Sequence, residues 1–291
     1  MLIIKVLRNF ETKYCFKVEN SYNALNIRRY AKNMKNARLL FREFKTLPIR
    51  KMKRENCDEI KKVKIEESGE RLVPINTFPE RIINQPEYFI QGIKGALPVG
   101  YMREGAYKNL LRAASMLPKG FRLLVFDAWR PVSVQMELYN RVKDMLKLKN
   151  PDASCGEISE LAEEFIAFPS ESETEPPPHG TGGAVDLTIV DSFGIPLNMG
   201  TEFDEIAENT PTRFYEEKTE RGEKLSETEK EILENRRLLF NIMESAGFRN
   251  YAGEWWHYDY GNQRWAWCVG NGRTAFYGRA KPKFTWRKDI S

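Results

Sequence analysis

The apolar residues of the chain recur with two periods, and each period predicts one kind of element. In Arg103–Leu117 they repeat every three or four positions until Pro118, which predicts a helix. The apolar run Phe121–Trp129 predicts a buried strand. A second helical pattern follows over 131–149, where Pro131 suits the first helical turn. Helices and strands therefore alternate through this region.

Further elements are predicted in the C-terminal half of the chain. Helical patterns occupy Glu157–Phe168 and the segment after Ser226, where Ser226 and Glu229 have the spacing of a capping box. Between them the alternating segment AVDLTIV (184–190) predicts a strand. Its central aspartate needs a structural or chemical reason, because aspartate is rare in the middle of an apolar strand.

Together these elements predict an α+β fold, with a central, largely antiparallel sheet and helices packed around it. The segment 248–261 adds two β-rich stretches, broken at Ala252-Gly253. Residues Asn209–Lys224 are polar and rich in turn formers, so we expect a surface loop there.

Charge divides the chain into two parts. Residues 1–65 contain 18 Lys and Arg against 6 Asp and Glu, whereas the whole chain carries only +5. The apolar residues of Tyr22–Phe44 allow one amphipathic helix, and 51–71 has the composition of a linker. We therefore predict a basic extension over residues 1–71 and the main domain over 72–291. A nucleic-acid tether is the alternative, but the extension has no RNA- or DNA-binding signature, so we expect no nucleic-acid partner.

Composition narrows the class of protein. No run approaches the roughly 20 apolar residues that a membrane span needs, and the first residues lack a secretion signal. The four cysteines are scattered, which is typical of free thiols in a reducing compartment. We expect a cytoplasmic protein without a membrane span. Met52 offers an alternative translation start.

The chain has only two histidines, and both lie in unusual local sequences. A catalytic zinc ion takes three protein ligands and keeps one position open, a need that two imidazoles and one carboxylate meet. His179, Asp186 and His257 are the candidates, because glycines follow His179 and allow the backbone to bend toward Asp186. The alternative for His257 is a core histidine with satisfied hydrogen bonds.

Two further residues could carry chemistry beside such a metal. Glu254 precedes His257 by three positions and is a candidate general base, if it lies at a bulge or at the start of a strand next to Gly253. Arg130 leaves the predicted strand 121–129, where its guanidinium could stabilise an oxyanion. The alternatives are a solvated Glu254 and an ion pair between Arg130 and Asp127.

Three ordered blocks resemble the D-alanyl-D-alanine dipeptidases of the VanX type, which are zinc enzymes. The blocks are FDAWRP, HGTGGAVDLTIVD with LNMGTEFDE, and NRRLLFNIMESAGFRNYAGEWWHY. The resemblance implies a D,D-peptidase-like fold with one zinc ion, held by His179, Asp186 and His257. It further implies that Glu254 is the base, that Arg130 stabilises the transition state and that Asp204 binds the substrate ammonium.

The resemblance implies a cell-wall enzyme that hydrolyses the D-Ala-D-Ala dipeptide to D-alanine through metal-activated water, with a small dipeptide as its only expected partner. Two alternatives stay open: a D,D- or L,D-carboxypeptidase acting on longer cell-wall peptides, and a non-catalytic zinc-binding module. Where the family often has serines beside the first histidine, this chain has Pro178 and Gly180. The extension and the tail after Tyr258 lie outside the resemblance.

Overall fold

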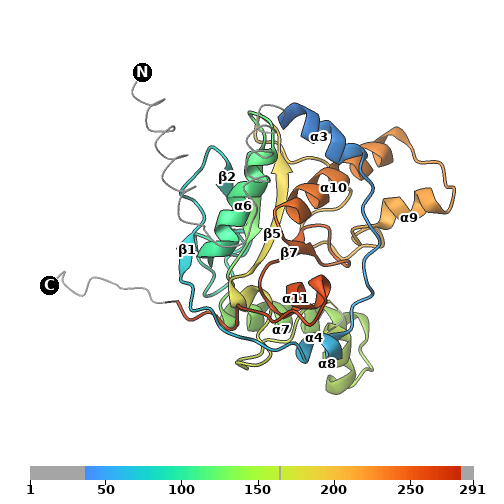
Figure 1. Cartoon of the computed structure of the whole chain (residues 1–291). Coiled ribbons are helices and arrows are strands. Elements are labelled where there is room, and N and C mark those ends of the chain that lie inside the picture. Colours follow the sequence, from blue (N-terminus) through green and yellow to red (C-terminus); the bar gives the residue numbers. More distant parts are fainter. Residues whose placement is uncertain (1–36, 164, 283–291) are drawn as a thin grey trace.

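A five-stranded sheet forms the centre of the protein (Figure 1). In this computed structural model, which describes residues 37–163 and 165–282, the strands lie in the order β2, β4, β5, β7 and β6. β2 runs parallel to β4, and the other three pairings are antiparallel, so the prediction of a largely antiparallel sheet is confirmed. The bounds are Ile82–Asn84 (β2), Arg122–Asp127 (β4), Ala184–Val190 (β5), Arg249–Asn250 (β6) and His257–Asp259 (β7).

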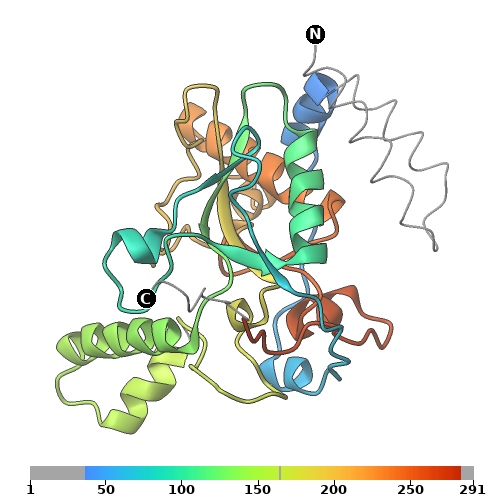
Figure 2. The same cartoon turned by 90° about the vertical axis from the view of Figure 1, so that its left-hand side faces the viewer.

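Two long helices, α6 (Glu104–Met116) and α10 (Glu227–Ser245), cover one face of this sheet (Figures 1 and 2). Successive side chains of a strand point to opposite faces. In β5 the residues that join the core beneath these helices are Val185, Leu187 and Ile189. Asp186 therefore points to the other face of the sheet, away from the main apolar core.

The local signals in the sequence place these helices correctly. α6 lies within one residue of its predicted bounds at each end. α10 begins after Ser226, whose hydroxyl accepts the N–H of Glu229 while the Glu229 carboxylate accepts the N–H of Ser226, which confirms the capping box. The predicted helix over 131–149 is α7 (Val132–Lys149), and it packs against α8 (Cys155–Glu163) in a pair that extends away from the sheet (Figure 2).

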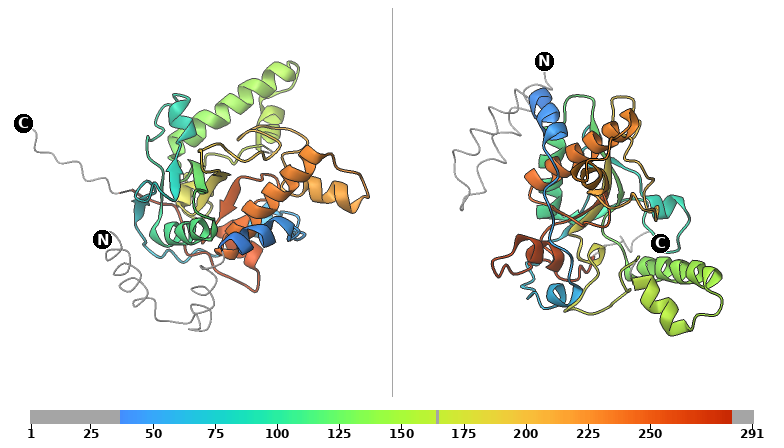
Figure 3. Two further views of the ribbon diagram at one scale, coloured as in Figure 1. Left: turned by 90° about the horizontal axis from the view of Figure 1, so that it is seen from above. Right: turned by 90° about the vertical axis from the view of Figure 1, so that its right-hand side faces the viewer.

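The described part of the predicted extension lies against the rest of the protein. α3 (Ala37–Thr46) packs on α10, where Asn241 donates a 2.8 Å hydrogen bond to the carbonyl of Leu47. α4 (Cys57–Lys61) lies beside α11 (Gln263–Val269), as the right-hand view of Figure 3 shows. The boundary after residue 71 stays a prediction, and the helix predicted over Tyr22–Phe44 lies outside the described residues before Ala37.

Short elements connect the extension to the sheet. The chain passes from residue 71 into β1 (Leu72–Pro74), which pairs with β3 (Tyr101–Arg103) as a separate two-stranded sheet. α5 (Glu87–Ile90) follows β2 and contacts β4. β1 and β3 also contact α6, which covers the main sheet.

The prediction of a loop over Asn209–Lys224 is wrong in part, because α9 (Phe214–Glu220) lies within it. Tyr215 is buried in a small cluster with Leu225, Ile232 and Leu233. A polar helix of seven residues is too short to show a long apolar period in the sequence, so only its packing against α10 reveals it.

Candidate metal centre and active site

The register of the three middle strands brings polar side chains into one row. Asp127 of β4 pairs with Asp186 of β5, and Asp186 pairs in turn with His257 of β7. The pairing of β4 with β5 is irregular between Val125 and Asp127, and this bulge sets Asp127 opposite Asp186. The row lies on the face opposite α6 and α10.

A tight turn adds the second histidine to this row. His179 opens a 3₁₀ turn, η1 (His179–Thr181), and Gly182 ends it with φ of +71°, a left-handed conformation that favours glycine. At Gly183 a Cβ would lie 2.2 Å from the carbonyl oxygen of Tyr260, so no side chain fits there. The buried guanidinium of Arg103 holds the turn through a 2.9 Å bond to the Thr181 carbonyl.

The three candidate metal ligands meet within one small volume. Nε2 of His179 lies 3.3 Å from Oδ2 of Asp186, and Nδ1 of His257 lies 3.0 Å from Oδ1 of Asp186. The two ring nitrogens are 3.2 Å apart. All three residues are buried, and one ligand atom from each lies within 4.8 Å of the others. The structure thus brings together the three residues singled out in the sequence.

Hydrogen bonds on the far side of each ring fix the tautomers that a metal needs. Nδ1 of His179 lies 2.7 Å from the carbonyl oxygen of Ala128, and Nε2 of His257 lies 3.1 Å from Oδ2 of Asp259. Both of these ring nitrogens therefore donate N–H groups, so the two nitrogens beside Asp186 are the ones that can offer lone pairs to a metal. A metal cation between these two nitrogens and the carboxylate of Asp186 would bind all three.

The electrostatics of the cluster also favour a cation. Burial opposes the protonated form of His257, but Asp259 and Asp186 outweigh it and raise the pKa of His257 to about 10. Burial likewise opposes the ionised form of Asp186, yet His179 and His257 lower the pKa of this carboxyl. Without a metal, His257 is therefore protonated at neutral pH, and a metal ion bound at its Nδ1 would take the place of that proton.

Glu254 lies beside this cluster in the irregular segment before β7, three residues before the strand begins and not at its first position. Its Oε2 lies 4.0 Å from Nδ1 of His257. Burial raises the pKa of Glu254, His257 opposes this shift and Asp186 adds to it. A carboxyl with a raised pKa next to a metal centre is suited to accept and return a proton near neutral pH.

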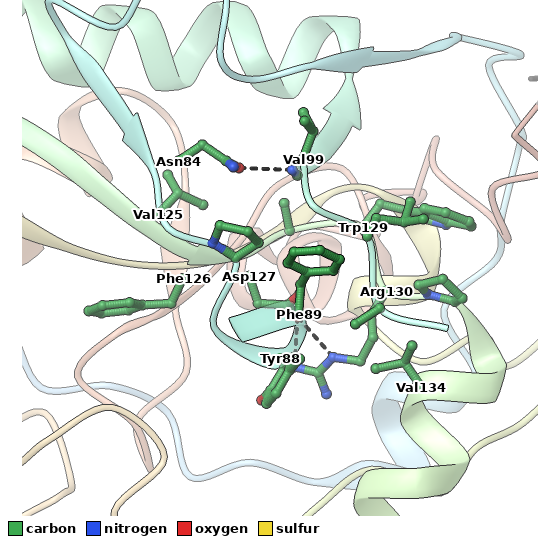
Figure 4. Close-up of a pocket in the computed structure, with 16 residues that line it drawn as sticks. Asn84, Tyr88, Phe89, Val99, Val125, Phe126, Asp127, Trp129, Arg130 and Val134 are labelled. Atoms are coloured by element: carbon green, nitrogen blue, oxygen red, sulfur yellow. Dashed lines mark hydrogen bonds and ion pairs between the residues drawn. The ribbon is translucent and has the colours of Figure 1, made fainter. Parts of the chain in front are cut away.

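Arg130 follows the end of β4, and Figure 4 shows its side chain beside Tyr88 and Asp127. Its Nη2 lies 3.6 Å from Oδ2 of Asp186, and its Nε donates a 2.8 Å bond to Asp127. The predicted alternative of an ion pair with Asp127 is thus present, and the same pair directs Arg130 into the site. Gln135 and Tyr88 accept its other N–H groups, at 2.7 and 3.2 Å.

Asp204 faces Arg130 across the site. Its φ of +61° is a left-handed conformation that is uncommon outside glycine, and its carboxylate accepts a 2.7 Å hydrogen bond from the hydroxyl of Tyr88. Desolvation, with repulsion from Asp186 and Glu254, raises the pKa of Asp204 to about 7, although Tyr88 and Arg130 oppose the shift. The residue keeps an exposed side, so a ligand can reach it from solvent.

The sequence profile described as D-ala-D-ala dipeptidase, peptidase M15, matches residues 102–269. The chain belongs to this family. A protein of Synechocystis named D-alanyl-D-alanine dipeptidase is 31% identical over 238 residues, which are 75% of this chain and 95% of that protein. Proteins with the same name from Enterococcus faecium and Escherichia coli are each 28% identical, over 52% and 48% of this chain and 68% and 55% of their own lengths. Because the family is metal-dependent, the protein is a metallopeptidase.

The metallopeptidase site includes residues that the sequence did not reveal. Asp259 lies two positions after His257 in β7, and the strand period of two could have placed both on one face. Tyr88 lies in α5, outside the region that the family profile matches, and no local pattern marks it. It joins Arg130 to Asp204 through one hydroxyl group.

Proposed function

We propose that the protein hydrolyses a free D,D-dipeptide, D-Ala-D-Ala, at a single zinc ion held by His179, Asp186 and His257. The observation that carries the proposal is the meeting of these three ligands beside Glu254 and Arg130 on one face of the sheet. The name that the relatives share supplies the substrate.

The donor set of the cluster fits zinc. Two neutral imidazole nitrogens and one carboxylate are ligands that zinc prefers, and three protein ligands leave a position for substrate or water. Among the described residues, the group of His, Cys, Asp and Glu side chains that can share one ion has these three members. Three ligands support a catalytic ion and disfavour a purely structural zinc. When bound there, zinc supplies a Lewis acid that lowers the pKa of water from 15.7 toward about 7 and polarises the peptide carbonyl.

The protein's own groups then divide the work of hydrolysis. Glu254 takes the proton of the attacking water and returns it to the leaving amine. The guanidinium of Arg130, which stays charged in the site, donates to the oxygen on which negative charge develops. The contact of Arg130 with Asp127 fixes its direction, so little reorganisation is needed as the charge forms.

Asp204 would select a free amino terminus. A dipeptide presents an ammonium group close to its scissile bond. An ionised carboxylate in the same site can pair with this group. Tyr88 holds Asp204 and Arg130 on one hydroxyl, which fixes the spacing between the ammonium site and the oxyanion site. Longer peptides carry an uncharged amide in place of that ammonium and leave Asp204 without a partner.

The decisive experiment measures release of free D-alanine from D-Ala-D-Ala before chelation, after chelation and after zinc is returned. L-Ala-L-Ala, an acetyl-capped D-Ala-D-Ala and a longer peptide that ends in D-Ala-D-Ala are assayed beside it. Chelator-sensitive cleavage of the free D,D-dipeptide alone supports the proposal. Cleavage of the longer peptide alone would identify a carboxypeptidase, and zinc-loaded protein that cleaves none of them would contradict peptidase activity on these substrates.

We further propose that the enzyme acts in the cytoplasm, with residues 72–291 as its catalytic domain and residues 1–71 as an extension. Within the described residues, no helix is both long and apolar enough to cross a membrane. Cys57 and Cys155 are exposed free thiols, which are typical of a reducing compartment. Cell fractionation with an antibody against the native chain tests the location.

A further inference from the structure

A chain of charged side chains runs from the extension to the metal centre. Oε1 of Glu55 accepts a 2.5 Å hydrogen bond from Nε of Arg264, and Nη1 of Arg264 lies 3.6 Å from Oδ2 of Asp259. The same oxygen of Asp259 lies 3.1 Å from Nε2 of His257. Four residues, two acids and two bases, thus alternate between the extension and a predicted metal ligand.

The position of Asp259 decides how well His257 can bind a metal. Asp259 is completely buried, and its second oxygen accepts a 2.5 Å bond from the side-chain amide of Asn262. A carboxylate that accepts the N–H of His257 holds the ring in the metal-binding tautomer. It also makes the opposite ring nitrogen a stronger metal ligand. Anything that draws Asp259 away from His257 weakens this support.

Arg264 is the group that could draw it away. A guanidinium and a buried carboxylate form strong, short hydrogen bonds when both are free to approach. Here Nη1 of Arg264 stays 3.6 Å from Asp259, longer than a hydrogen bond, and 3.3 Å from Nε2 of His257. The ring of Tyr251 lies against the guanidinium, with 4.4 Å between its carbon Cζ and the ring centroid.

Glu55 keeps Arg264 in this arrangement. It accepts the hydrogen bond of Nε and supplies negative charge there. The positive charge of Arg264 is therefore compensated without a direct hydrogen bond to Asp259. The side chains of Arg264 and Glu55 are 19% and 21% exposed, which leaves their attraction only partly screened by water. Glu55 lies in the extension, before the region that the family profile matches, whereas Arg264 lies within it.

We propose that Glu55 is a positioning residue of the metal centre: by holding Arg264, it keeps Asp259 on the N–H of His257. The extension thereby takes part in metal binding through a residue that lies before the region that the family profile matches. This inference rests on the proposed role of His257 as a metal ligand.

The same two segments offer a matched control. Glu59 of α4 accepts a 2.7 Å hydrogen bond from Nε1 of Trp267 in α11 and a 2.8 Å bond from Lys53. It therefore ties the extension to α11 as Glu55 does. No described contact leads from Trp267 to Asp259 or His257, so loss of Glu59 loosens the packing without disturbing the ligand.

The experiment compares E55Q, E59Q, H257A and the unchanged protein, each as the full chain. Zinc affinity is measured by competition with a chromophoric chelator, and the visible absorption spectrum is recorded after loading with Co²⁺. We expect E55Q to weaken zinc binding about tenfold, the lower end of the range for outer residues of metal sites, and to change the Co²⁺ spectrum. E59Q should keep both properties, and thermal unfolding of each variant reports whether it is folded.

A double variant tests that Glu55 acts through Arg264. If it does, the fold-loss of zinc affinity in E55Q/R264Q is smaller than the product of the fold-losses in the two single variants. The reason is that R264Q removes the group that Glu55 restrains. An unchanged zinc affinity in E55Q, or an equal loss in E59Q, would overturn the proposal while leaving the proposed function intact. Zinc binding that H257A does not weaken would overturn the proposed metal centre and this inference together.

Discussion

Asp186 and His257 are direct partners across β5 and β7, and Oδ1 of Asp186 lies 3.0 Å from Nδ1 of His257. The hydrogen-bond ladder of the sheet therefore sets the distance between two candidate metal ligands. A ligand pair held by backbone pairing is rigid, because moving one side chain requires slipping the strand register. His179 comes from a turn that Arg103 holds beside this pair.

Glu254 is expected to matter for turnover and not for the metal. Replacing Glu254 by Gln keeps its shape but removes the proton acceptor, so kcat for D-Ala-D-Ala should fall about 10²- to 10⁴-fold. Zinc content, measured by elemental analysis, should stay at one ion per chain. Near-normal kcat in E254Q would refute its role as the base, and loss of zinc would show that it is a ligand.

Asp186 is expected to control both zinc binding and the stability that zinc confers. Zinc at about 100 times its dissociation constant should raise the free energy of unfolding by about 2.7 kcal/mol, because it binds the folded state alone. In D186N the buried cluster loses its only negative ligand, so added zinc should no longer raise the melting temperature. The control is the unchanged protein treated with chelator and then with zinc. An equal zinc-dependent rise in D186N would exclude Asp186 as a ligand.

The raised pKa of Asp204 predicts how substrate binding depends on pH. Its pKa is raised to about 7, so the carboxyl is neutral below this pH and ionised above it. Only the ionised form pairs with the substrate ammonium, so KM for the free dipeptide should rise as the pH falls below about 7, approaching tenfold per pH unit. Steady-state kinetics between about pH 5 and 8 measure the effect.

The matching variant, D204N, tests the origin of that pH dependence. It should show a high KM that no longer changes with pH in this window, together with weaker discrimination against the acetyl-capped dipeptide. If D204N keeps the pH profile of the unchanged protein, another group binds the ammonium.

Turnover should be sensitive even to the replacement of Arg130 by lysine. Lys has one compact charge and cannot contact Asp127, Gln135 and Tyr88 at once, as the fork of Arg130 does. We expect R130K to lower kcat about 10²- to 10³-fold, the usual cost of removing one donor to a developing oxyanion. Zinc affinity should change little. A variant with normal kcat would show that Arg130 serves only to pair with Asp127.

The capping box of α10 is expected to affect the stability of the protein and not its catalysis. Ser226→Ala removes the hydroxyl that accepts the N–H of Glu229, so the free energy of unfolding in urea should fall by about 1 kcal/mol. S192A, at an exposed loop serine, is the control and should leave stability unchanged. Because the cap is part of a helix on the face of the sheet opposite Asp186, kcat per folded molecule should stay the same in both.

The sequence alone determined most of the regular elements and the three members of the candidate metal cluster. The helices α6, α7 and α10 follow from residues within each segment: an apolar period, a proline in the first turn and a capping box. These signals depend on near neighbours along the chain, so one sequence is enough to predict them. The cluster was predictable because histidines are rare in this chain and because an aspartate interrupts an apolar strand.

Only the tertiary structure decided how the site is supported. Tyr88 and Glu55 carry no local signal of their roles, because their partners Asp204 and Arg264 lie far away in the sequence. α9 was missed for the same reason, since its buried residue Tyr215 packs against α10 and not within its own turn. Local order follows from neighbours along the chain, whereas the exact distances around a metal follow from strand register and packing between distant segments.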